Sequence, residues 1–434
     1  MLLLHLFRLT LLLICIYTAR HYYFTLNRLF GRQRHPYIDI ENANWPAITV
    51  LVAAHNEEAV VADILKALLE VDYPAGCLTI IPVNDRSTDR TREIIDDFAE
   101  LHPCIEPFHR VGGKPGKAAA LKDAMELVNT EIVLIFDADY VPGKSLIRQL
   151  VAPFFDPEIG AVMGRVVPLN VGKKLLTRLL DLERSGGYQV DQQARMNLHM
   201  VPQYGGTVAG IRKSALYEIG GWNENALAED TDLTYRLLLA GWKTAYENRA
   251  ECYEEVPERW PVRVRQIMRW AKGHNQAMVS YLFQTARNSS LSWLERVDGV
   301  LLLGVYLMGP VLLLGWLLAV VLFYTGVQIG GGVTVLALGA FTTLGNFAAF
   351  FEIATAARLD GSRQRIRLLP LTLFGFTVSL ISVSRAGWQQ AREQILGHSE
   401  LVWDKTERSR TVPALSHPLP VLNDAPLPLL EDAH

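Results

Sequence analysis

Between residues 300 and 384 the chain is almost continuously apolar, and this stretch limits what the sequence can fold into. Its first part, residues 300–323, would be about 36 Å long as a helix, enough to cross the hydrocarbon core of a bilayer. Two further apolar segments follow at about 333–356 and 368–383. We therefore predict about three transmembrane helices within residues 298–390.

The N-terminus is also apolar, with three polar or charged residues among residues 2–17. A cleaved signal peptide would look similar, but no small-residue cleavage site follows, so we predict a membrane anchor over residues 1–20. Basic residues follow this anchor and recur at 358–367, which by the positive-inside rule places the intervening domain in the cytoplasm of a multi-pass cell-membrane protein. The side of the C-terminus stays open, because three later spans would put its basic residues outside.

The remaining composition excludes several classes of protein. A net charge of −3 gives no reason to expect a nucleic-acid partner, and the four scattered cysteines indicate neither a disulfide framework nor a zinc site. The Pro-rich segment 411–434 is predicted to be disordered. Residues 46–258 mix charged and apolar positions as a soluble domain does, and 259–297 is predicted to form amphipathic helices at the membrane interface.

The soluble segment alternates strand and helix patterns. Residues 48–54 are too apolar for a strand with one wet face, which is typical of a strand buried on both sides of a parallel sheet. Asn56 is predicted to cap the helix that follows, and Ser87 or Thr88 to start the next one. With further strands at 78–83 and 132–136, the pattern predicts a doubly wound α/β sheet.

In such a sheet, ligands bind at the carboxyl ends of the strands, where Asp85 and the pair Asp137 and Asp139 lie. A carboxylate at Asp85 could accept hydrogen bonds from a base or ribose, although an Asx-type turn explains it equally simply. Asp137 and Asp139 follow five buried apolar residues, and Mg²⁺ or Mn²⁺ bound to diphosphate takes such carboxylates. The alternative is an acidic strand end facing solvent.

Two further positions carry charges at helix starts. Lys117 follows a Gly-rich loop at the start of a helix and could hold phosphate, although the Walker spacing is absent and a basic flexible loop remains the alternative. Asp230 opens another helix, where an acid is usually a cap. As a general base Asp230 would have Glu229 and Asp232 as rivals.

The run Arg-Gln-Ile-Met-Arg-Trp places Gln266, Arg269 and Trp270 at i, i+3 and i+4 of a predicted helix, so that Gln266 and Arg269 share one face. Its basic residues alternate with apolar ones. An amphipathic helix lying on anionic lipid is therefore an alternative, and one that is compatible with a role in the site.

Taken in order, the motifs around Asp85, Asp137 and Asp139, Asp230 and Q-x-x-R-W resemble the processive family 2 glycosyltransferases, such as cellulose, chitin, hyaluronan and mannan synthases. The resemblance covers residues 48–277. Residues 188–193, with Gly-Gly-Thr at 205–207, look most like the cellulose-synthase-like mannan and glucan synthases. The chain has fewer predicted spans than bacterial cellulose synthase, so a second copy or a partner subunit could complete an export channel.

The resemblance implies a GT-A (Rossmann-like) nucleotide-sugar-binding domain and inverting transfer with Asp230 as the base. It implies Asp139 as the main metal ligand, with Asp137 beside it, for Mg²⁺ or Mn²⁺. The implied nucleotide-sugar-binding residues are Ala54, Glu57, Asp85, Lys117, Asp137, Gln266 and Arg269, and the implied acceptor-binding residues are Gly205, Gly206, Thr207 and Trp270.

Three hypotheses follow. The first is a processive β-glycosyltransferase that extends, and could export, a polysaccharide from a UDP- or GDP-sugar. The second is transfer of a single sugar to a lipid carrier, and the third is an inactive scaffold or channel subunit. Glu352, inside the second late span, could line a sugar path, but we expect it to reach toward the membrane surface instead.

Overall fold

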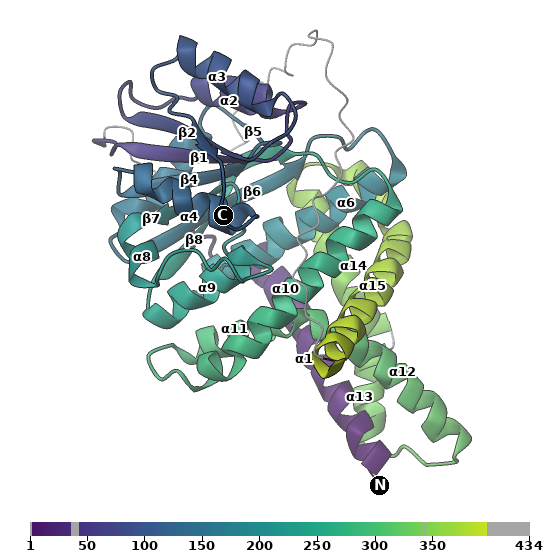
Figure 1. Ribbon diagram of the computed structural model, residues 1–434. Helices are drawn as coiled ribbons and strands as arrows, with labels where there is room; N and C mark the ends of the chain where they lie inside the picture. The colour runs from purple at the N-terminus through teal and green to yellow at the C-terminus, as the bar shows by residue number, and fades with distance from the viewer. Residues whose placement is uncertain (1, 36–42, 342, 397–434) are drawn as a thin grey trace, which may run out of the picture.

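An eight-stranded mixed sheet forms the centre of the molecule, with strand order β3-β2-β1-β4-β7-β6-β8-β5 (Figure 1). The computed structural model describes residues 2–35, 43–341 and 343–396. The strands are β1 Ile48–Ala54, β2 Leu78–Asp85, β3 Phe108–Arg110, β4 Ile132–Asp137, β5 Val141–Pro142, β6 Ile159–Pro168, β7 Ala209–Arg212 and β8 Lys243–Glu254.

Half of this sheet matches the doubly wound arrangement. Strands β3, β2, β1 and β4 run parallel. The other half differs, because β7 is antiparallel to both β4 and β6, and β5 is antiparallel to β8. The predicted doubly wound pattern rested on the strands up to β4 and is confirmed there, and the sequence analysis assigned no direction to the strands that follow. Short strands such as β7 give too little periodicity for the sequence to reveal their direction.

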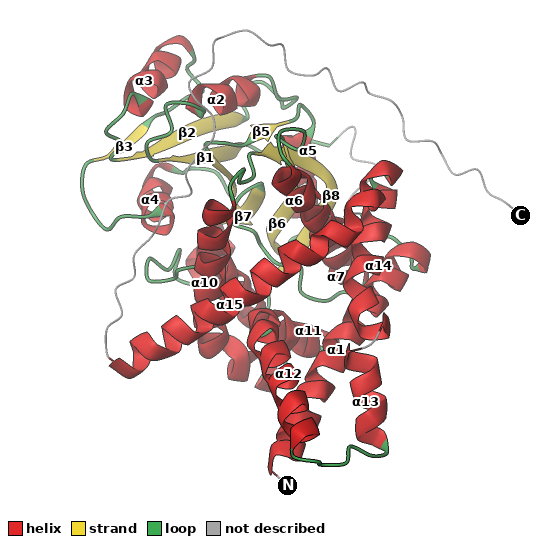
Figure 2. Ribbon diagram, turned by 90° about the vertical axis from the view of Figure 1, so that its right-hand side faces the viewer, coloured by secondary structure: helices red, strands yellow, loops and turns green. Residues whose placement is uncertain are grey.

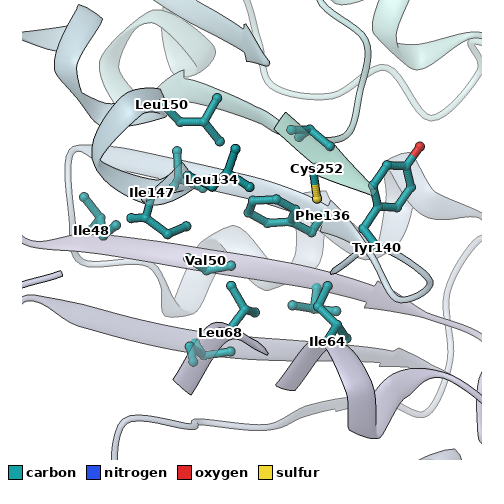
Figure 3. Close-up of a cluster of buried hydrophobic side chains, with 14 of the residues drawn as sticks. Ile48, Val50, Ile64, Leu68, Leu134, Phe136, Tyr140, Ile147, Leu150 and Cys252 are labelled. Atoms are coloured by element: carbon teal, nitrogen blue, oxygen red, sulfur yellow. The ribbon is translucent and has the colours of Figure 1, made fainter. Parts of the chain in front are cut away.

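Helices cover both faces of the sheet, as the apolar strands require. Val50 and Val52 of β1 join the core on one face, and Leu51 joins the core on the other. Figure 3 shows the first of these cores, in which Ile64 and Leu68 pack beneath Val50. The first face carries α2 Val61–Leu69, α3 Thr91–Leu101 and α5 Leu146–Val151, and the second carries α4 Lys117–Ala124, α8 Lys213–Glu218 and α9 Glu229–Ala240.

The predicted helix starts were wrong at two places. Helix α2 begins at Val61, and Asn56 instead accepts a hydrogen bond from the Thr88 backbone N–H at 2.7 Å. Helix α3 begins at Thr91, while the Ser87 hydroxyl accepts from the Asn56 N–H at 2.9 Å. These polar residues therefore tie two neighbouring loops together at the sheet edge instead of capping helices.

Long helices extend away from the sheet domain (Figures 1 and 2). In the described part of the chain, three helical segments are long and apolar enough to cross a membrane: residues 2–30, 305–324 and 364–396. The helices of this part are α1 Leu2–Phe30, α10 Trp260–Arg287, α11 Trp293–Leu303, α12 Met308–Tyr324, α13 Gly332–Phe341, α14 Thr343–Leu359 and α15 Leu369–Leu396. The predicted disordered segment 411–434 lies outside the described residues.

The predicted span 300–323 is divided at Gly304, where α11 ends and a short 3-10 turn leads into α12. Leu302 and Leu303 are buried against Tyr235 of α9, in a cluster beneath the sheet domain. The first residues of the apolar run therefore pack onto the sheet domain instead of beginning a transmembrane helix. Hydropathy alone does not distinguish burial in protein from burial in lipid.

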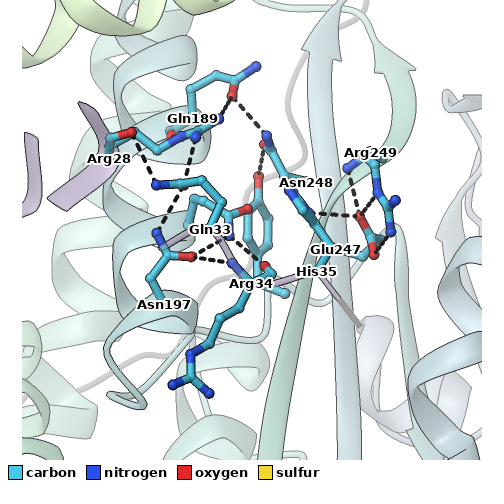
Figure 4. Close-up of polar contacts among 11 residues, drawn as sticks. Arg28, Gln33, Arg34, His35, Gln189, Asn197, Glu247, Asn248 and Arg249 are labelled. Atoms are coloured by element: carbon cyan, nitrogen blue, oxygen red, sulfur yellow. Dashed lines mark hydrogen bonds and ion pairs between the residues drawn. The ribbon is translucent and has the colours of Figure 1, made fainter. Parts of the chain in front are cut away.

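Three short helices, α6 Leu175–Ser185, the π-helical η3 Gly186–Gln192 and α7 Gln193–Asn197, lie between the sheet and α1. The end of α1 is tied to them by side chains (Figure 4): Arg28 Nε donates to the Gln189 carbonyl at 2.7 Å, and the Arg34 N–H donates to Asn197 Oδ1 at 2.9 Å. The N-terminal helix is thus fixed directly to the sheet domain.

Candidate active site

One cavity of about 1120 Å³ opens at the carboxyl ends of β1, β2 and β4 and extends between α1, α10, α12 and α15. It is larger than the roughly 300–1,000 Å³ usual for one ligand. Of the predicted site residues, it is lined by Ala54, Glu57, Asp85, Lys117, Asp137, Asp139, Gly205, Thr207, Asp230, Gln266, Arg269 and Trp270. Gly206 is outside the lining, but its carbonyl accepts from Lys117 Nζ at 2.8 Å.

Asp85 lies at the end of β2 and binds two arginines. Its Oδ1 accepts from Arg110 Nη1 at 2.7 Å and from Arg86 Nε at 2.8 Å. Burial opposes ionisation, but the hydrogen bonds from Arg86 and Gly116 and the charge of Arg110 hold the pKa of Asp85 below its ordinary value. The turn alternative was wrong for this residue, because Asn84 accepts the Ser87 N–H instead.

Lys117 lies among acids at the same edge. Its Nζ is 2.5 Å from Asp137 Oδ1 and 3.9 Å from Glu229 Oε1. Burial lowers the pKa of Lys117, but Asp137 and Glu229 outweigh that effect and raise it, so the ammonium stays charged. Lys117 is the first residue of α4, where the sequence analysis also expected a helix to start, and its ion pair with Asp137 connects this helix to the end of β4.

Asp137 and Asp139 bracket the end of β4, and Asp139 is only 3% exposed. The solvent-facing alternative therefore does not hold for Asp139. Two carboxylates suit a hard divalent cation, which commonly takes one or two protein carboxylates and completes its shell with phosphate oxygens and water. Among the described residues, no third histidine, cysteine or acid joins this pair within ligand spacing.

Asp230 is the second residue of α9, and its Oδ1 accepts the Thr231 N–H at 2.6 Å. Burial raises the pKa of Asp230, and this exceeds the opposing effects of the Thr231 N–H and Lys117. Ala228, and not Asp230, occupies the helix cap position. A half-buried carboxylate with a raised pKa beside a cavity is suited to accept a proton.

The two rival acids differ from each other. Asp232 is bound by Arg236 Nε at 2.7 Å, by the Tyr281 hydroxyl at 2.6 Å and by Asn223 Nδ2 at 3.0 Å, and it does not line the cavity. Because three side chains already donate hydrogen bonds to Asp232, we assign this carboxylate a structural role. Glu229 does line the cavity and remains a rival to Asp230.

Gly206 explains how the backbone approaches Asp230. It has φ +72°, and a Cβ added there would lie 3.2 Å from Asp230 Cβ. Close by, the β-branched Val208 has φ +49°, a conformation that costs energy and is concentrated at functional sites. The Gly-Gly-Thr turn is therefore shaped around the carboxylate.

Helix α10 presents Gln266, Arg269 and Trp270 to the cavity. The Trp270 ring lies between the guanidinium groups of Arg184 and Arg263, at 5.6 and 5.2 Å from its centroid. The lipid-surface alternative does not fit this part of α10, because Ile267 is buried against Val383 of α15.

Several lining residues were not predicted. They come from α1 and from the α6–η3–α7 segment: Arg20, His21, Arg184, Tyr188, Asp191, Gln192 and Arg195. The run 188–193 carried part of the family resemblance, which was the only available signal. Glu352 does not reach the membrane surface as predicted; it is 6% exposed and hydrogen-bonds to His21 Nδ1.

Comparison with known proteins gives a family match over residues 46–273, to the family described as "Glycosyltransferase like family 2". "Probable glycosyltransferase YdaM" of Bacillus subtilis is 36% identical over 245 residues, which are 55% of this chain and 58% of that protein. "Beta-monoglucosyldiacylglycerol synthase" of Synechocystis is 31% identical over 60% of this chain and 54% of that protein. The chain thus spans little more than half the length of these two relatives.

"Poly-beta-1,6-N-acetyl-D-glucosamine synthase" of Staphylococcus epidermidis is 28% identical over 63% of this chain and 65% of that protein. Among solved structures, "Mannosyltransferase PcManGT from Pyrobaculum calidifontis in complex with GDP-Man and Mn2+" superposes with a TM-score of 0.58 at 19% identity. That match covers 91% of this chain and 99% of the other, and it confirms the predicted GT-A-like fold.

Proposed function

Because the chain belongs to glycosyltransferase family 2 and is a glycosyltransferase, we propose that it transfers a sugar from a nucleotide-sugar to a membrane-associated acceptor with inversion at the anomeric carbon. One observation carries this proposal. A single cavity joins the ion-paired carboxylates at the sheet edge to Asp230 and Trp270, so donor, base and acceptor sites are continuous.

On the donor side, we propose that Asp85 binds the nucleoside and that Ala54 and Glu57 line the nucleoside-binding site. Asp137 and Asp139 would hold Mg²⁺ or Mn²⁺, which supplies charge neutralisation for the departing diphosphate. Lys117 would bind a phosphate oxygen, with Gln266 and Arg269 facing the diphosphate from α10. The present partners of Lys117, Asp137 and the Gly206 carbonyl, lie within its reach at the proposed diphosphate position.

On the acceptor side, Asp230 would accept the proton of the attacking hydroxyl. General base catalysis of this kind contributes roughly 10²–10⁴-fold. With one base and no carboxylate nucleophile, the displacement is direct, and an α-linked donor gives a β-linked product. The turn Gly205, Gly206 and Thr207 would seat the acceptor against the backbone, and Trp270 would support its sugar ring.

The first acceptor hypothesis is a growing polysaccharide, made processively. Its support is the helix carrying Q-x-x-R-W, which lines the cavity beside Asp230, together with the similarity to a relative named as a poly-N-acetylglucosamine synthase. Export would then need a route across the membrane, to which a second copy or a partner subunit could contribute.

The second hypothesis is transfer of a single sugar to a lipid. A specific observation favours it: the end of the cavity farther along the chain's membrane helices is lined by apolar side chains, including Leu312, Trp316 and Phe376. The similarity to a relative named as a glucosyldiacylglycerol synthase agrees with this hypothesis.

We further propose the membrane arrangement predicted above, with the sheet domain on the cytoplasmic side. The basic loop after α14 makes ion pairs with the sheet domain, since Arg365 Nη1 lies 2.8 Å from Asp181 Oδ2 of α6 and Asp360 lies 3.2 Å from Arg165 of β6. These contacts support the proposal that this loop and the sheet domain lie on the same side of the membrane. The domain limits 1–20, 46–258, 259–297 and 298–390 remain proposals.

The test is to purify the full chain in detergent with Mg²⁺ or Mn²⁺ and to supply UDP-glucose, UDP-N-acetylglucosamine and GDP-mannose, each radiolabelled. Long products from one donor would support processive synthesis, and a lipid carrying one sugar would support the second hypothesis. Failure of every donor, with and without added lipid, would contradict the proposed activity of this chain alone.

A further inference from the structure

A set of buried and half-buried polar side chains lies between the reaction site and the apolar helices. We name it the polar chamber, formed by Arg20, His21, Asp191, Gln192, Arg195 and Gln203, all of which line the cavity. Its members come from α1, from η3 and α7, and from the loop before β7. No motif identified in the sequence accounts for this arrangement.

Hydrogen bonds connect the polar chamber to the candidate base. The Thr231 N–H binds Asp230 at 2.6 Å, and the Thr231 hydroxyl accepts from Gln203 Nε2 at 3.2 Å. Gln203 and Gln192 then exchange two hydrogen bonds between side chain and backbone, at 2.8 and 3.0 Å. A group held in the polar chamber therefore lies next to the reaction site.

On its other side the chamber adjoins the apolar end of the cavity. Ile14 of α1 lines the cavity together with Arg20 and His21, and lies about 10 Å from His21 along the helix at 1.5 Å per residue. Ile14 also packs in the cluster of α1, α12 and α13. The cavity thus changes from polar to apolar along one helix, as an amphiphile would require.

Carboxylates outnumber the arginines around the chamber. Arg195 Nε lies 3.2 Å from Asp298, Arg20 Nε lies 3.5 Å from the same carboxylate, and Glu352 binds His21. Burial opposes ionisation of Asp191, but Arg20 and Arg195 hold its pKa below the ordinary value, so it is an anion. Two arginines therefore face three carboxylates, and the chamber offers no excess positive charge.

The chamber also contains unused hydrogen-bonding atoms of both kinds. Among the described residues, Arg20 Nη2 donates to no acceptor and Asp191 Oδ1 accepts from no donor, and Arg20 is only 7% exposed. A hydroxyl both donates and accepts, whereas a phosphate oxygen chiefly accepts. Buried polar atoms of this kind call for a partner.

We propose that the polar chamber binds the hydroxyl-bearing headgroup of a neutral lipid acceptor, whose hydrocarbon chains occupy the apolar end of the cavity. The inference rests on the proposed transferase function and narrows its acceptor. A lipid phosphate is disfavoured, because its negative charge would face the Asp191 carboxylate. A divalent cation at His21, Asp191 and Glu352, whose ligand atoms lie within 4.8 Å of one another, would meet Arg20 and Arg195.

The experiment measures lipid binding to the full chain in nanodiscs without any nucleotide-sugar. The probe is a diacylglycerol with a photoreactive acyl chain, and the competitors are unlabelled diacylglycerol, phosphatidic acid with the same acyl chains, and a soluble β-gluco-oligosaccharide. We expect crosslinks to peptides containing Trp316 and Phe376, and competition by diacylglycerol at least about tenfold better than by phosphatidic acid. Equal or better competition by phosphatidic acid, or displacement by the oligosaccharide but not by diacylglycerol, overturns the proposal.

A variant sharpens the result. Asp191→Asn leaves two arginines facing two carboxylates instead of three and should reduce the preference for diacylglycerol over phosphatidic acid about tenfold, whereas Glu126→Gln, which changes an exposed carboxylate outside the cavity, should leave it unchanged. If Asp191→Asn does not fold, the wild-type competition still decides.

Binding is measured without turnover, so it separates the two proposals. Lipid preference with no transfer from any donor would contradict only the transferase function, and polymer synthesis without lipid competition would contradict only this inference.

Discussion

The two halves of the cavity are built in different ways. The sheet half, with Asp85, Lys117, Asp137, Asp139 and Asp230, stands on strand ends and helix starts within the segment 46–273. The helix half, the polar chamber and the apolar end, is assembled from α1, η3, α12, α14 and α15, which lie hundreds of residues apart in the sequence.

We propose that the sheet half carries out the transfer reaction and that the helix half determines which acceptor is bound. The sheet half contains the carboxylates and the lysine that we propose to act on the nucleotide-sugar, and it belongs to the part of the chain shared with the family. The helix half contains what an acceptor would touch. Variants in the first half should therefore affect every acceptor, and variants in the second should affect some acceptors more than others.

The largest expected effect is that of Asp230→Asn, which removes the proposed base. We expect transfer to fall roughly 10²–10⁴-fold with any acceptor, because the attacking hydroxyl keeps its proton. The measurement is the initial rate of product formation from a radiolabelled donor, with protein recovery and melting temperature recorded alongside.

Asp232→Asn is the matched control, two residues along the same helix. It leaves Arg236 without its ionic partner, and breaking a buried ion pair costs about 3–5 kcal/mol, so melting should fall. The fraction of Asp232→Asn protein that remains folded should transfer sugar at the wild-type rate. Substantial product from Asp230→Asn, or loss of chemistry without loss of folding in Asp232→Asn, would contradict the assignment.

Lys117→Met should have the next largest effect. A hydrogen bond to a charged group is worth about 1.5–3 kcal/mol, which corresponds to roughly a 10–150-fold loss in kcat/KM for the donor. Since Lys117 also lowers the pKa of Asp230, the acid limb of the pH–rate profile should move to higher pH. A normal donor KM and an unmoved acid limb would show that Lys117 only joins α4 to the sheet edge.

The sequence predicted the sheet half well for a physical reason. Strands buried on both faces are strongly apolar, and the polar residues after them, Asp85, Asp137 and Asp139, fall at one edge because parallel strands share it. Their roles stay predictions, but their convergence on one cavity is confirmed.

The helix half could not be predicted in the same way. Apolar runs look alike whether they face lipid or protein, so the break at Gly304 was missed, and the partnership of His21 with Glu352 joins residues 331 positions apart. Without a motif or a period, nothing in the sequence relates two such positions before the helices are packed.

Trp270→Ala tests the boundary between the halves. Trp270 lies between Arg184 and Arg263, and we expect transfer to the acceptor to fall about tenfold, the equivalent of one cation–π or stacking contact of about 1.4 kcal/mol. Release of nucleoside diphosphate without acceptor should fall much less. Equal loss of both rates would remove the acceptor role, and the exposed Trp388→Ala serves as the control.

The smallest expected effect is on the melting temperature, which we compare for variants of two carboxylates in the sheet half, Asp230 and Asp85. The pKa of Asp230 is raised above its ordinary 3.8, mainly by burial, so its ionisation costs stability above the folded-state pKa, and the cost is relieved as pH falls through that value. Asp230→Asn should therefore melt at or slightly above the wild-type temperature at pH 7.5, with the gap closing in acid.

The pKa of Asp85 is instead lowered, so its stabilisation is present above the unfolded-state value and is lost as pH falls through the folded-state value. Asp85→Asn should then melt below wild type at pH 7.5, and this gap should persist down to about pH 4, because the stabilisation is lost only below the unfolded-state pKa of 3.8. Melting curves of the three proteins in one detergent from pH 4 to 8 make the comparison. Shifts of the same sign would mean that Asp230 is held by partners as Asp85 is, and a carboxylate held in that way is a poor base.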